Sequence, residues 1–512
     1  MTLADLLASL GDLVLASTAE PVADRAVRGL AHDSRRVTPG TLFIAVRGQK
    51  TDGATFAAQA LARGALAVVA EIAPPPGVQA PWVTVSDARA AMARLAAGFY
   101  ASPSEEMRVV GITGTNGKTT TAYLLSALFE AAGIRCGMLG TVVYRTGAEE
   151  RAATRTTPEA IDVQQMLREM VTRGCGACVM EVSSHALALG RVEGVRFAAA
   201  IFTNLTRDHL DFHRDMESYF AAKRRLFEML PAGAPAVVNA DDPRGPGLAS
   251  LVSRPVTYAL DAPADVRPAG LTQSLRGLSF EALTPAGPVQ IRSRLVGRPN
   301  VYNILAAVAA AVALDVPLAR IEQAMADLKG VPGRFEIVSG DEDDITVVVD
   351  YAHTDDALRN LLETARPLAP ERLITVFGCG GDRDRTKRPL MGAVAARLSD
   401  LVIVTSDNPR SEDPQQIIDE IKRGIVVPPE RSRPADPRTP QKYALPRTTP
   451  HLAIVDRRLA IARAVETAQP GDVVLLAGKG HEKYQVIGDR ELPFDDAAVA
   501  GDALARRRGK SA

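Results

Sequence analysis

The sequence predicts an α/β protein of three domains: a small N-terminal α/β domain, a central domain with a parallel sheet and a phosphate loop, and a C-terminal Rossmann-like α/β domain. The 512 residues are enough for about three domains of roughly 100–200 residues each. Short apolar runs alternate with helical patterns, which is typical of parallel sheets with right-handed crossovers. Two stretches that contain Pro and polar residues divide the chain into residues 1–104, 105–333 and 334–512.

The N-terminal domain begins with short strands rather than with a long helix. Strands are predicted at residues 41–46, 65–70 and 82–85, and an Ala-rich helix at 88–100. The polar stretch 101–106 contains Pro and is interpreted as a linker.

The central domain repeats a strand, a turn and a helix. Its first strand is predicted at residues 108–113, and later strands at 177–182, 198–203 and 236–239. The sequence Val-Pro-Gly-Arg-Phe at 331–335 indicates the second boundary.

The C-terminal domain returns to the same alternation. Strands are predicted at residues 345–350, 373–377, 401–405 and 473–477. Residues 426–450 contain seven prolines, which is typical of an irregular surface loop.

Composition excludes several classes of protein. The formal net charge is zero, so we expect no nucleic-acid partner. The sequence lacks an apolar run of the roughly 18 residues that a membrane span needs, so we expect no membrane insertion and a cytoplasmic location. The four cysteines include one Cys-x-x-Cys pair, Cys175 and Cys178, without the second pair that a structural zinc site needs. Buried thiols in a reducing compartment are expected instead.

A glycine-rich loop follows the strand at 108–113. It ends in Gly117, Lys118 and Thr119, and an amphipathic helix follows. Glycines let backbone N–H groups approach phosphate, Lys118 can reach the β- and γ-phosphates, and Thr119 can bind Mg²⁺. The spacing departs from the usual motif because Ile112, not Gly, stands six residues before the lysine. The strand–loop–helix context nevertheless predicts ATP binding.

Lys223 lies on the apolar face of a predicted helix at 215–230, four residues from both Tyr219 and Phe227. One interpretation is a lysine whose stem packs against the protein while its ammonium reaches water. The other is a lysine carbamylated by CO₂, which gives a metal-binding carboxylate that Arg could not provide. Glu181 and His209, near the ends of neighbouring predicted strands, are candidate ligands for Mg²⁺ or Mn²⁺.

Polar loops follow all four strands of the C-terminal domain. They begin at Asp350, Gly378, Ser406 and Gly478. Ligands of open α/β sheets bind beyond the carboxyl ends of the strands, so these loops predict a binding site. Arg383 and Arg410 suit a carboxylate, whereas Asp407 and Glu482 suit an ammonium. A ligand with both groups is an amino acid.

These motifs together resemble the Mur ligases over nearly the whole chain. The resemblance rests on Asp33–Arg35, Gly40–Ala45, Gly114–Thr121, Thr156–Pro158, Glu181–His185, Thr203–His209, Ala222, Lys223, Asn300, Asn303, Asp350–Thr354 and the other three C-terminal loops.

The resemblance implies one substrate for each domain. The N-terminal domain would bind a UDP-sugar peptide, the central domain ATP and the C-terminal domain an amino acid. The implied residues for the UDP-sugar peptide are Ser34, Gln49, Lys50, Thr51, Thr156, Thr157, Ser183 and Arg191. Those for ATP are Gly114, Thr115, Asn116, Gly117, Lys118, Thr119, Thr120, Asn303, Arg334 and Asp350. Those for the amino acid are Arg383, Asp407, Asn408, Pro409, Arg410, Gly478 and Glu482.

The implied catalytic group consists of Lys118, Glu181, His209 and Lys223. The metal ligands would be Thr119, Glu181, His209 and a carbamate derived from CO₂ on Lys223, with Mg²⁺ as the metal. The implied protein is a monomer that acts in the synthesis of peptidoglycan precursors. Its reaction is the ligation of meso-diaminopimelate to the D-Glu carboxylate of UDP-MurNAc-L-Ala-D-Glu, through an acyl phosphate.

The segment from Asp407 to Arg410, Asp-Asn-Pro-Arg, resembles the form that adds meso-diaminopimelate. Arg410 would pair with the second carboxylate of diaminopimelate, whereas it would face the ammonium end of L-lysine. The alternatives are an L-lysine-adding ligase, a phosphate-loop ATPase acting as a switch or in transport, and a ligase acting on folate or polyglutamate. Two positions depart from the family pattern, Leu189 in place of Gln and Arg155 in place of Asn.

Overall fold

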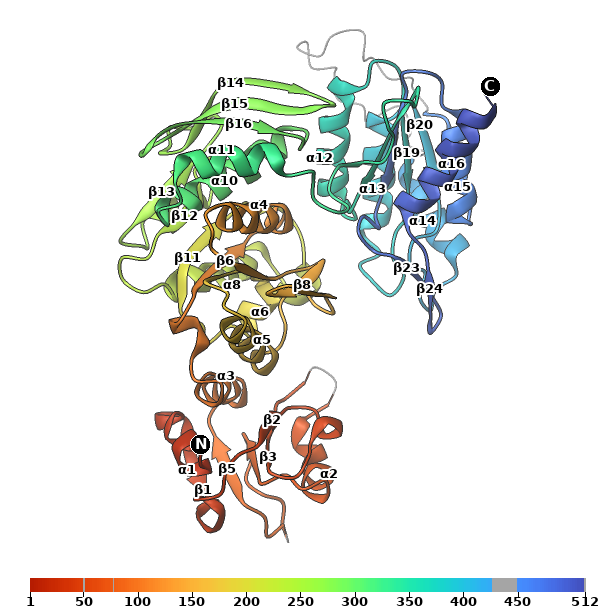
Figure 1. Ribbon diagram of the computed structural model, residues 1–512. Coiled ribbons are helices and arrows are strands. Elements are labelled where there is room, and N and C mark those ends of the chain that lie inside the picture. Colours follow the sequence, from red (N-terminus) through yellow and green to blue (C-terminus); the bar gives the residue numbers. More distant parts are fainter. Residues whose placement is uncertain (49–50, 77, 426–448, 511–512) are drawn as a thin grey trace.

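The computed structural model describes residues 1–48, 51–76, 78–425 and 449–510. The chain forms three α/β domains in a bent row (Figure 1). The N-terminal domain lies at one end, the central domain in the middle and the C-terminal domain at the other end. Most of the predicted Pro-rich segment lies outside the described residues.

The N-terminal domain contains a five-stranded sheet in the order β1-β5-β4-β3-β2. Four of its strands are parallel, and β1 pairs antiparallel with β5. β3 and β4 are buried along their whole length, as expected for parallel strands covered on both faces. The elements are α1 (Leu3–Ala8), β1 (Val14–Ser17), β2 (Gly29–Ala31), β3 (Thr41–Ala45), α2 (Ala57–Ala62), β4 (Ala67–Ala70), β5 (Trp82–Val85) and α3 (Ala88–Phe99).

The N-terminal domain packs firmly on the central one through α3 and α5. Ala160 and Ile161 of α5 belong to the same apolar cluster as the N-terminal core. Arg36 and Asp162 form an ion pair of 3.2 Å across the junction. A shared apolar cluster fixes the relative position of the two domains better than surface ion pairs alone.

The central domain is built on an eight-stranded sheet in the order β13-β12-β11-β6-β10-β7-β8-β9. The predicted parallel strands form its middle, whereas β8 and β9 extend it as antiparallel edge strands. A separate antiparallel sheet of β14, β15 and β16 was not predicted from the sequence. The elements are β6 (Arg108–Thr113), α4 (Lys118–Ala131), β7 (Cys136–Leu139), β8 (Val143–Thr146), β9 (Glu149–Ala152), α5 (Ala160–Thr172), β10 (Ala177–Glu181), α6 (Ser184–Ala188), β11 (Phe197–Phe202), α7 (Leu210–His213), α8 (Met216–Glu228), β12 (Ala236–Asn239), α9 (Gly245–Ala249), β13 (Pro255–Tyr258), β14 (Arg267–Ser274), β15 (Gly277–Thr284), β16 (Gly287–Ser293), α10 (Arg298–Ala313) and α11 (Leu318–Asp327).

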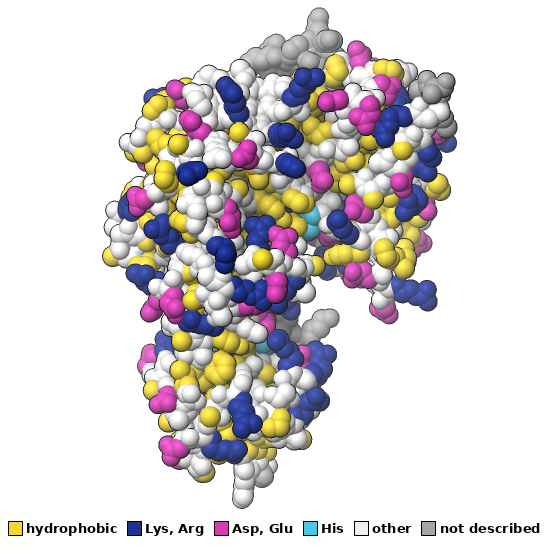
Figure 2. Space-filling model, in the orientation of Figure 1, with side chains coloured by type: hydrophobic (Ala, Val, Ile, Leu, Met, Phe, Trp, Pro, Cys, Tyr) yellow, Lys and Arg dark blue, Asp and Glu magenta, His cyan; other side chains and the backbone are white. Residues whose placement is uncertain are grey.

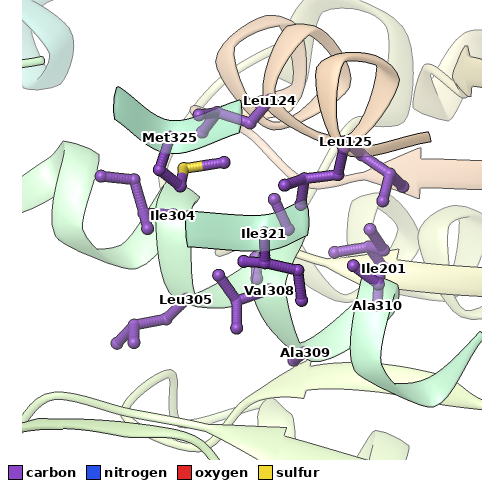
Figure 3. Close-up of a cluster of buried hydrophobic side chains, with 14 of the residues drawn as sticks. Leu124, Leu125, Ile201, Ile304, Leu305, Val308, Ala309, Ala310, Ile321 and Met325 are labelled. Carbon is purple, nitrogen blue, oxygen red and sulfur yellow. The ribbon is translucent and has the colours of Figure 1, made fainter. Parts of the chain in front are cut away.

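An apolar core holds the helix that follows the phosphate loop. Leu124 and Leu125 of α4 face Ile304 and Val308 of α10 and Ile321 of α11 (Figure 3). α10 is rich in Ala and Val and is buried nearly all round, so two helices and a sheet can pack against it closely. This packing fixes the direction in which the N-terminus of α4 points.

The C-terminal domain has a six-stranded sheet in the order β17-β18-β22-β19-β20-β21. All its strands are parallel except β17. The carboxyl ends of β18, β22, β19 and β20 therefore meet at one edge, as predicted. The elements are β17 (Glu336–Ile337), β18 (Thr346–Asp350), α12 (Asp355–Ala365), β19 (Leu373–Phe377), α13 (Lys387–Leu398), β20 (Leu401–Val404), α14 (Pro414–Ile425), β21 (His451–Ala453), α15 (Arg457–Thr467), β22 (Val473–Ala477), β23 (Tyr484–Ile487), β24 (Arg490–Pro493) and α16 (Asp496–Lys510).

The cysteines and the lengths of the helices bear on two expectations from composition. All four cysteines are buried and unbridged, which confirms that Cys175 and Cys178 are buried thiols. Among the described residues, no helix has the length and apolar character that a membrane span requires.

Candidate active site

The phosphate loop joins the end of β6 to the start of α4. Gly114 and Gly117 have positive φ angles of 148° and 89°. A Cβ atom at Gly114 would lie 1.9 Å from the Thr203 hydroxyl, and one at Gly117 would lie 2.3 Å from Asn303 Oδ1. Both positions therefore need glycine for conformation and for space. Gly117 has no side chain that could cap α4, so the first N–H groups of the helix are available to an anion.

Lys118 folds back over the loop. Its Nζ donates hydrogen bonds of 2.9 Å to the carbonyl oxygen of Gly114 and of 2.8 Å to that of Thr115. Burial lowers the pKa of the ammonium, and the carboxylate of Glu181 opposes this shift. The cation is thus held at the loop by neutral carbonyl groups, where a phosphate would improve its environment.

Glu181, at the end of β10, lies beside the loop and is 1% exposed. Its Oε2 accepts hydrogen bonds of 3.0 Å from the hydroxyls of Thr119 and Thr141, and its Oε1 accepts one of 2.8 Å from the Thr141 N–H. Arg334 reaches across from the other side and donates to the Thr119 hydroxyl at 3.1 Å. A hydroxyl and a carboxylate therefore stand together at the start of α4.

Lys223 on α8 is 1% exposed, so the interpretation of an ammonium that reaches water is wrong. Its Nζ donates to the Gly114 carbonyl oxygen at 2.7 Å and lies 4.4 Å from the centre of the Tyr219 ring. Burial, together with the nearby Lys118, lowers the pKa of Lys223 well below its usual value. Burial therefore favours the neutral amine of Lys223 over its ammonium form.

His209 lies in a cluster of aromatic rings beside α8. Its ring centre is 4.8 Å from that of His185 and 6.1 Å from that of Tyr219. The residue has a φ of 52°, so it marks a sharp change of direction at the start of α7. Asp208 precedes it in the chain, and its carboxylate lies 3.5 Å from His209 Nε2.

A cavity of about 300 Å³ lies over these groups and extends to the C-terminal domain. We call it the phosphate-loop cavity. Every residue predicted for catalysis, ATP binding or metal binding lines it: Gly114, Thr115, Asn116, Gly117, Lys118, Thr119, Thr120, Glu181, His209, Lys223, Asn303, Arg334 and Asp350.

The C-terminal domain closes one side of the phosphate-loop cavity. Arg334 stacks on the Tyr351 ring with its guanidinium 4.7 Å from the ring centre. Asp350 accepts hydrogen bonds from the N–H groups of Phe335 at 2.7 Å and Ala352 at 2.8 Å, and burial raises its pKa. Asn116 of the phosphate loop also bonds across the boundary to Asp356, at 3.2 Å.

A second cavity, of about 560 Å³, lies at the carboxyl edge of the C-terminal sheet. We call it the C-terminal cavity. Six of the seven residues predicted for the amino acid line it, namely Arg383, Asp407, Asn408, Arg410, Gly478 and Glu482. Pro409 does not line it. Its carbonyl oxygen packs against Gly381, where a Cβ would lie only 1.9 Å from that oxygen.

The C-terminal cavity contains groups of both charges. Arg410 has a φ of 52° and donates to the Gly381 carbonyl oxygen at 2.8 Å, while Arg383 is exposed and donates to the Asp382 carbonyl oxygen. Both guanidinium groups therefore bond to carbonyl oxygens and keep their charge for a ligand. On the acidic side, Asn408 donates to Glu482 at 2.8 Å, and the carboxylate of Asp407 is buried beside them.

The residues predicted for the UDP-sugar peptide are spread over two domains. Thr156 and Ser183 line the phosphate-loop cavity, whereas Ser34, Thr51, Thr157 and Arg191 line neither cavity. The predicted Gln49 and Lys50 lie outside the described residues.

Three of these groups form one network near the junction of the first two domains. The Thr157 hydroxyl donates to the Glu181 carbonyl oxygen at 2.8 Å and accepts from the Ser183 N–H at 3.1 Å. Arg191 donates to the Thr157 carbonyl oxygen at 3.2 Å. Farther out, the Ser34 hydroxyl donates to Gln59 at 2.8 Å. Figure 2 shows Lys and Arg side chains, interspersed with Asp and Glu, around the junction of the first two domains and beside the wide notch between the N-terminal and C-terminal domains.

The two positions that depart from the family pattern lie near this network. Arg155 and Arg191 both bond to the same oxygen of Glu159, at 2.6 and 2.8 Å. Two guanidinium groups thus share one carboxylate. Nothing in the structure assigns a role to Leu189, which is half-buried after α6.

The two cavities share a wall. Asp208, His209, Tyr351, His353 and Thr354 line both of them. A group activated at the phosphate loop and a group held by the C-terminal loops would therefore lie next to the same five residues.

Sequence reasoning missed several residues of the site. Asp208 and His353 stood inside motifs that were recognised, but they received no role. Thr141 lies in a loop of the central domain without any local motif, and only the fold brings it to Glu181. Lys479 lies between Gly478 and Glu482, which were both predicted to bind the amino acid. This position in the sequence was the signal that could have identified it.

Comparison with known proteins gives matches along most of the chain. Residues 26–100 match the model described as Mur ligase family, catalytic domain. Residues 112–311 match the Mur ligase middle domain, and residues 333–480 match the Mur ligase, glutamate ligase domain.

Curated relatives and solved structures agree with these matches. The chain is 51% identical, over 92% of both sequences, to the UDP-N-acetylmuramoyl-L-alanyl-D-glutamate–2,6-diaminopimelate ligase of Geobacter metallireducens. It is 49% identical, over 95% of both, to the protein of the same name from Solibacter usitatus. A solved structure of a ligase with this name matches with a TM-score of 0.67 and 35% identity over 99% of both chains. A MurF ligase from Thermotoga maritima in complex with ADP shares the fold, with a TM-score of 0.63 and 18% identity over 95% of this chain and 99% of the other.

Proposed function

The chain belongs to the Mur ligase family, and from this premise we propose that it joins meso-2,6-diaminopimelate to the D-Glu carboxylate of UDP-MurNAc-L-Ala-D-Glu with the energy of ATP. It is an ATP-dependent ligase that forms an amide bond in peptidoglycan synthesis. The observation that carries the proposal is the wall shared by the two cavities, because it places a nucleotide-type phosphate loop next to an amino-acid-type site.

The reaction would proceed in two steps. A carboxylate oxygen of D-Glu attacks the γ-phosphorus of ATP, ADP leaves and an acyl phosphate forms. The amine of diaminopimelate then attacks the acyl carbon, the C–O bond to phosphate breaks, and phosphate and a proton are released. Lys118 and the N–H groups at the start of α4 stabilise the negative charge on the transferring phosphoryl group. Arg334 and His209 line the space where this charge develops.

The residues beside the loop fit Mg²⁺. This ion binds through one or two carboxylates, substrate phosphates and water, rather than in a cage made only of protein groups. The hydroxyl of Thr119 and the carboxylate of Glu181 lie 3.0 Å apart and could both face it, with His209 farther along the cavity. Within the described part of the chain, no group of three or more His, Cys, Asp or Glu side chains could hold a metal by itself. When bound, Mg²⁺ would neutralise phosphate charge.

We propose that Lys223 carries a carbamate. The neutral amine adds to CO₂ and loses a proton, which leaves a carboxylate on a buried side chain. Burial supports this because it lowers the pKa of the amine and so favours the neutral form. The new carboxylate would lie beside the phosphate loop and add a metal ligand to Thr119 and Glu181.

The choice of diaminopimelate over L-lysine rests on the names of the curated relatives and on Arg410. Diaminopimelate has a second carboxylate where lysine has only an ammonium. Arg410 lines the cavity and bonds to a neutral carbonyl oxygen, so its charge is available for that carboxylate. The lysine-adding alternative is not favoured. A phosphate-loop ATPase acting as a switch or in transport would leave the C-terminal cavity without a role. A solved folylpolyglutamate synthase is similar to this chain only at the level of the fold.

The UDP-sugar peptide site, the domain boundaries and the oligomeric state are further parts of the proposed function. Ser34, Thr51, Thr156, Thr157, Ser183 and Arg191 would bind the UDP-sugar peptide, with Arg191 held by the Thr157 carbonyl oxygen. Boundaries at 104/105 and 333/334 would separate the three domains. We further propose that the protein works as a monomer in the cytoplasm, where ATP is available.

A phosphate-release assay with purified protein tests the function. We expect release only when UDP-MurNAc-L-Ala-D-Glu, ATP, Mg²⁺ and meso-diaminopimelate are all present, with a higher kcat/KM for diaminopimelate than for L-lysine. Faster turnover with lysine would overturn the choice of amino acid, and release that does not depend on any amino acid would overturn the ligase assignment.

A further inference from the structure

Lys479 lies fully buried behind the acidic side of the C-terminal cavity. It follows Gly478, just after the end of β22, and it is 0% exposed. Its Nζ lies 3.5 Å from Asp407 Oδ1 and 3.4 Å from Glu482 Oε2. Burying an ammonium is costly unless charged partners compensate for lost water, so this position indicates a specific task.

Lys479 also orients the amide that joins the two carboxylates. Asn408 Oδ1 accepts from Lys479 Nζ at 3.1 Å and from the Val486 N–H at 3.0 Å. With its oxygen held in this way, the Asn408 Nδ2 group points to Glu482 and donates to it at 2.8 Å. The lysine thus fixes the position of Glu482 both directly and through Asn408.

The charges of this group do not cancel. Asp407 and Glu482 bring two carboxylates, and Lys479 brings one ammonium. The nearby Arg457 does not supply the missing cation, because it is paired with Asp496 at 2.6 Å. One negative charge is left over, and it can be balanced by one cationic group of a ligand.

One acceptor atom of the group also lacks a donor. Asp407 is 6% exposed, and its Oδ1 has no hydrogen-bond partner among the described residues, since Lys479 Nζ at 3.5 Å pairs with it only as a charge. Beside the other oxygen of this carboxylate, Oδ2, Gly478 leaves space, because a Cβ there would lie 2.9 Å from it. A buried carboxylate oxygen without a donor is costly, and a ligand ammonium would supply one.

We propose that Lys479 is a positioning residue of the amino-acid site, which neutralises one of the two carboxylates and holds Asn408 and Glu482 so that the acidic group receives a single ligand ammonium. This inference rests on the proposed function. It assigns Lys479 no contact with the substrate. Its effect is on the binding of the amino acid and not on ATP.

The test compares Lys479→Ala, Lys479→Met and the matched control Lys483→Ala. Lys483 lies in the same loop, but its side chain is 79% exposed. Truncating one member of a buried charge pair weakens binding strongly, so we expect Lys479→Ala to raise the KM for diaminopimelate about tenfold or more. The KM for ATP should stay the same, and Lys483→Ala should resemble the wild type.

Chemical rescue separates charge from packing. Ethylammonium fits the space left by Lys479→Ala and restores a cation, so it should lower the raised KM, whereas ethanol at the same concentration should not. Lys479→Met fills the space without a charge. It should show the raised KM and no response to ethylammonium.

Each outcome either supports or contradicts the role proposed for Lys479. Equal KM values for Lys479→Ala and Lys483→Ala, or equal rescue by ethanol, would overturn the inference. If Lys479→Ala does not fold, calorimetric titration of Lys479→Met with diaminopimelate replaces it, and wild-type affinity in that variant would overturn the inference. A wild-type protein that needs no diaminopimelate for phosphate release would instead contradict the proposed function itself.

Discussion

The two cavities treat their buried lysines differently. In the phosphate-loop cavity, Lys118 and Lys223 donate to carbonyl oxygens of the loop at 2.7–2.9 Å. In the C-terminal domain, Lys479 lies between the carboxylates of Asp407 and Glu482. The first arrangement leaves the charge of Lys118 for a ligand, whereas the second uses the lysine to reduce negative charge.

This difference indicates what each cavity binds. Excess positive charge at a helix N-terminus favours phosphate. Arginines that bond to carbonyl oxygens, in the same cavity as an incompletely neutralised acid pair, favour a molecule with both carboxylate and ammonium groups. The net charge of a buried cluster therefore indicates the type of ligand better than the number of charged side chains in the cluster does.

The largest effect is expected for Lys118→Met. The loss of the cation at the transferring phosphoryl group should lower kcat by about a thousandfold, the size seen when a preorganised charge is removed. Phosphate release at saturating substrates measures it. Lys329→Met, which replaces an exposed lysine, is the control and should retain wild-type activity. A Lys118→Met enzyme within tenfold of the wild type would mean that the loop does not stabilise the transferred group.

A smaller loss is expected for Lys223→Ala. It should lower kcat by about a hundredfold, because a positioned carboxylate at the metal site is lost. Short carboxylic acids such as formate should restore part of the activity. Arg224→Ala, on the exposed side of the same helix, serves as the control. Full activity of Lys223→Ala, or mass spectra of the native protein in bicarbonate buffer without a carbamate on Lys223, would remove this role.

Arg410→Met should act on one substrate only. The loss of a charge-assisted bond to the second carboxylate should raise the KM for diaminopimelate by about tenfold to a hundredfold. The preference for diaminopimelate over L-lysine should fall by a similar factor. Arg385→Met, at an exposed arginine paired with Glu420, should leave the preference unchanged. An unchanged ratio of kcat/KM values in Arg410→Met would show that specificity lies elsewhere.

The smallest effect concerns pH, at the boundary between the central and C-terminal domains. Burial, with a contribution from Arg334, lowers the pKa of His481 to about 4. The unfolded chain therefore binds this proton more tightly than the folded one, and stability should fall as the pH decreases from about 6.5 toward about 4.

Calorimetric scans between pH 7.5 and 4.5 test the role of His481. The melting temperature of the wild type should fall more steeply with acid than that of His481→Asn. Parallel slopes for the two proteins would show that His481 does not titrate on unfolding.

Much of the site could be predicted because it lies in continuous motifs. Each predicted strand of the parallel sheets appeared within about two residues of its expected ends, and the loops beyond them line the two cavities. The sheet of β14, β15 and β16 was missed although burial alternates along β15 and β16. β14 is mostly exposed and has no such alternation. Antiparallel pairing is decided by neighbours that a local pattern does not contain.

The sequence by itself determined the type of chemistry, because a glycine loop with Lys118 and a lysine on an apolar helix face are local features. The tertiary structure decided how the charges are paired. Whether Lys223 is buried, whether Lys479 meets two carboxylates, and whether the two cavities share a wall depend on segments far apart in the chain. The physical reason is that electrostatic energy depends on burial and distance, and only the folded chain sets both.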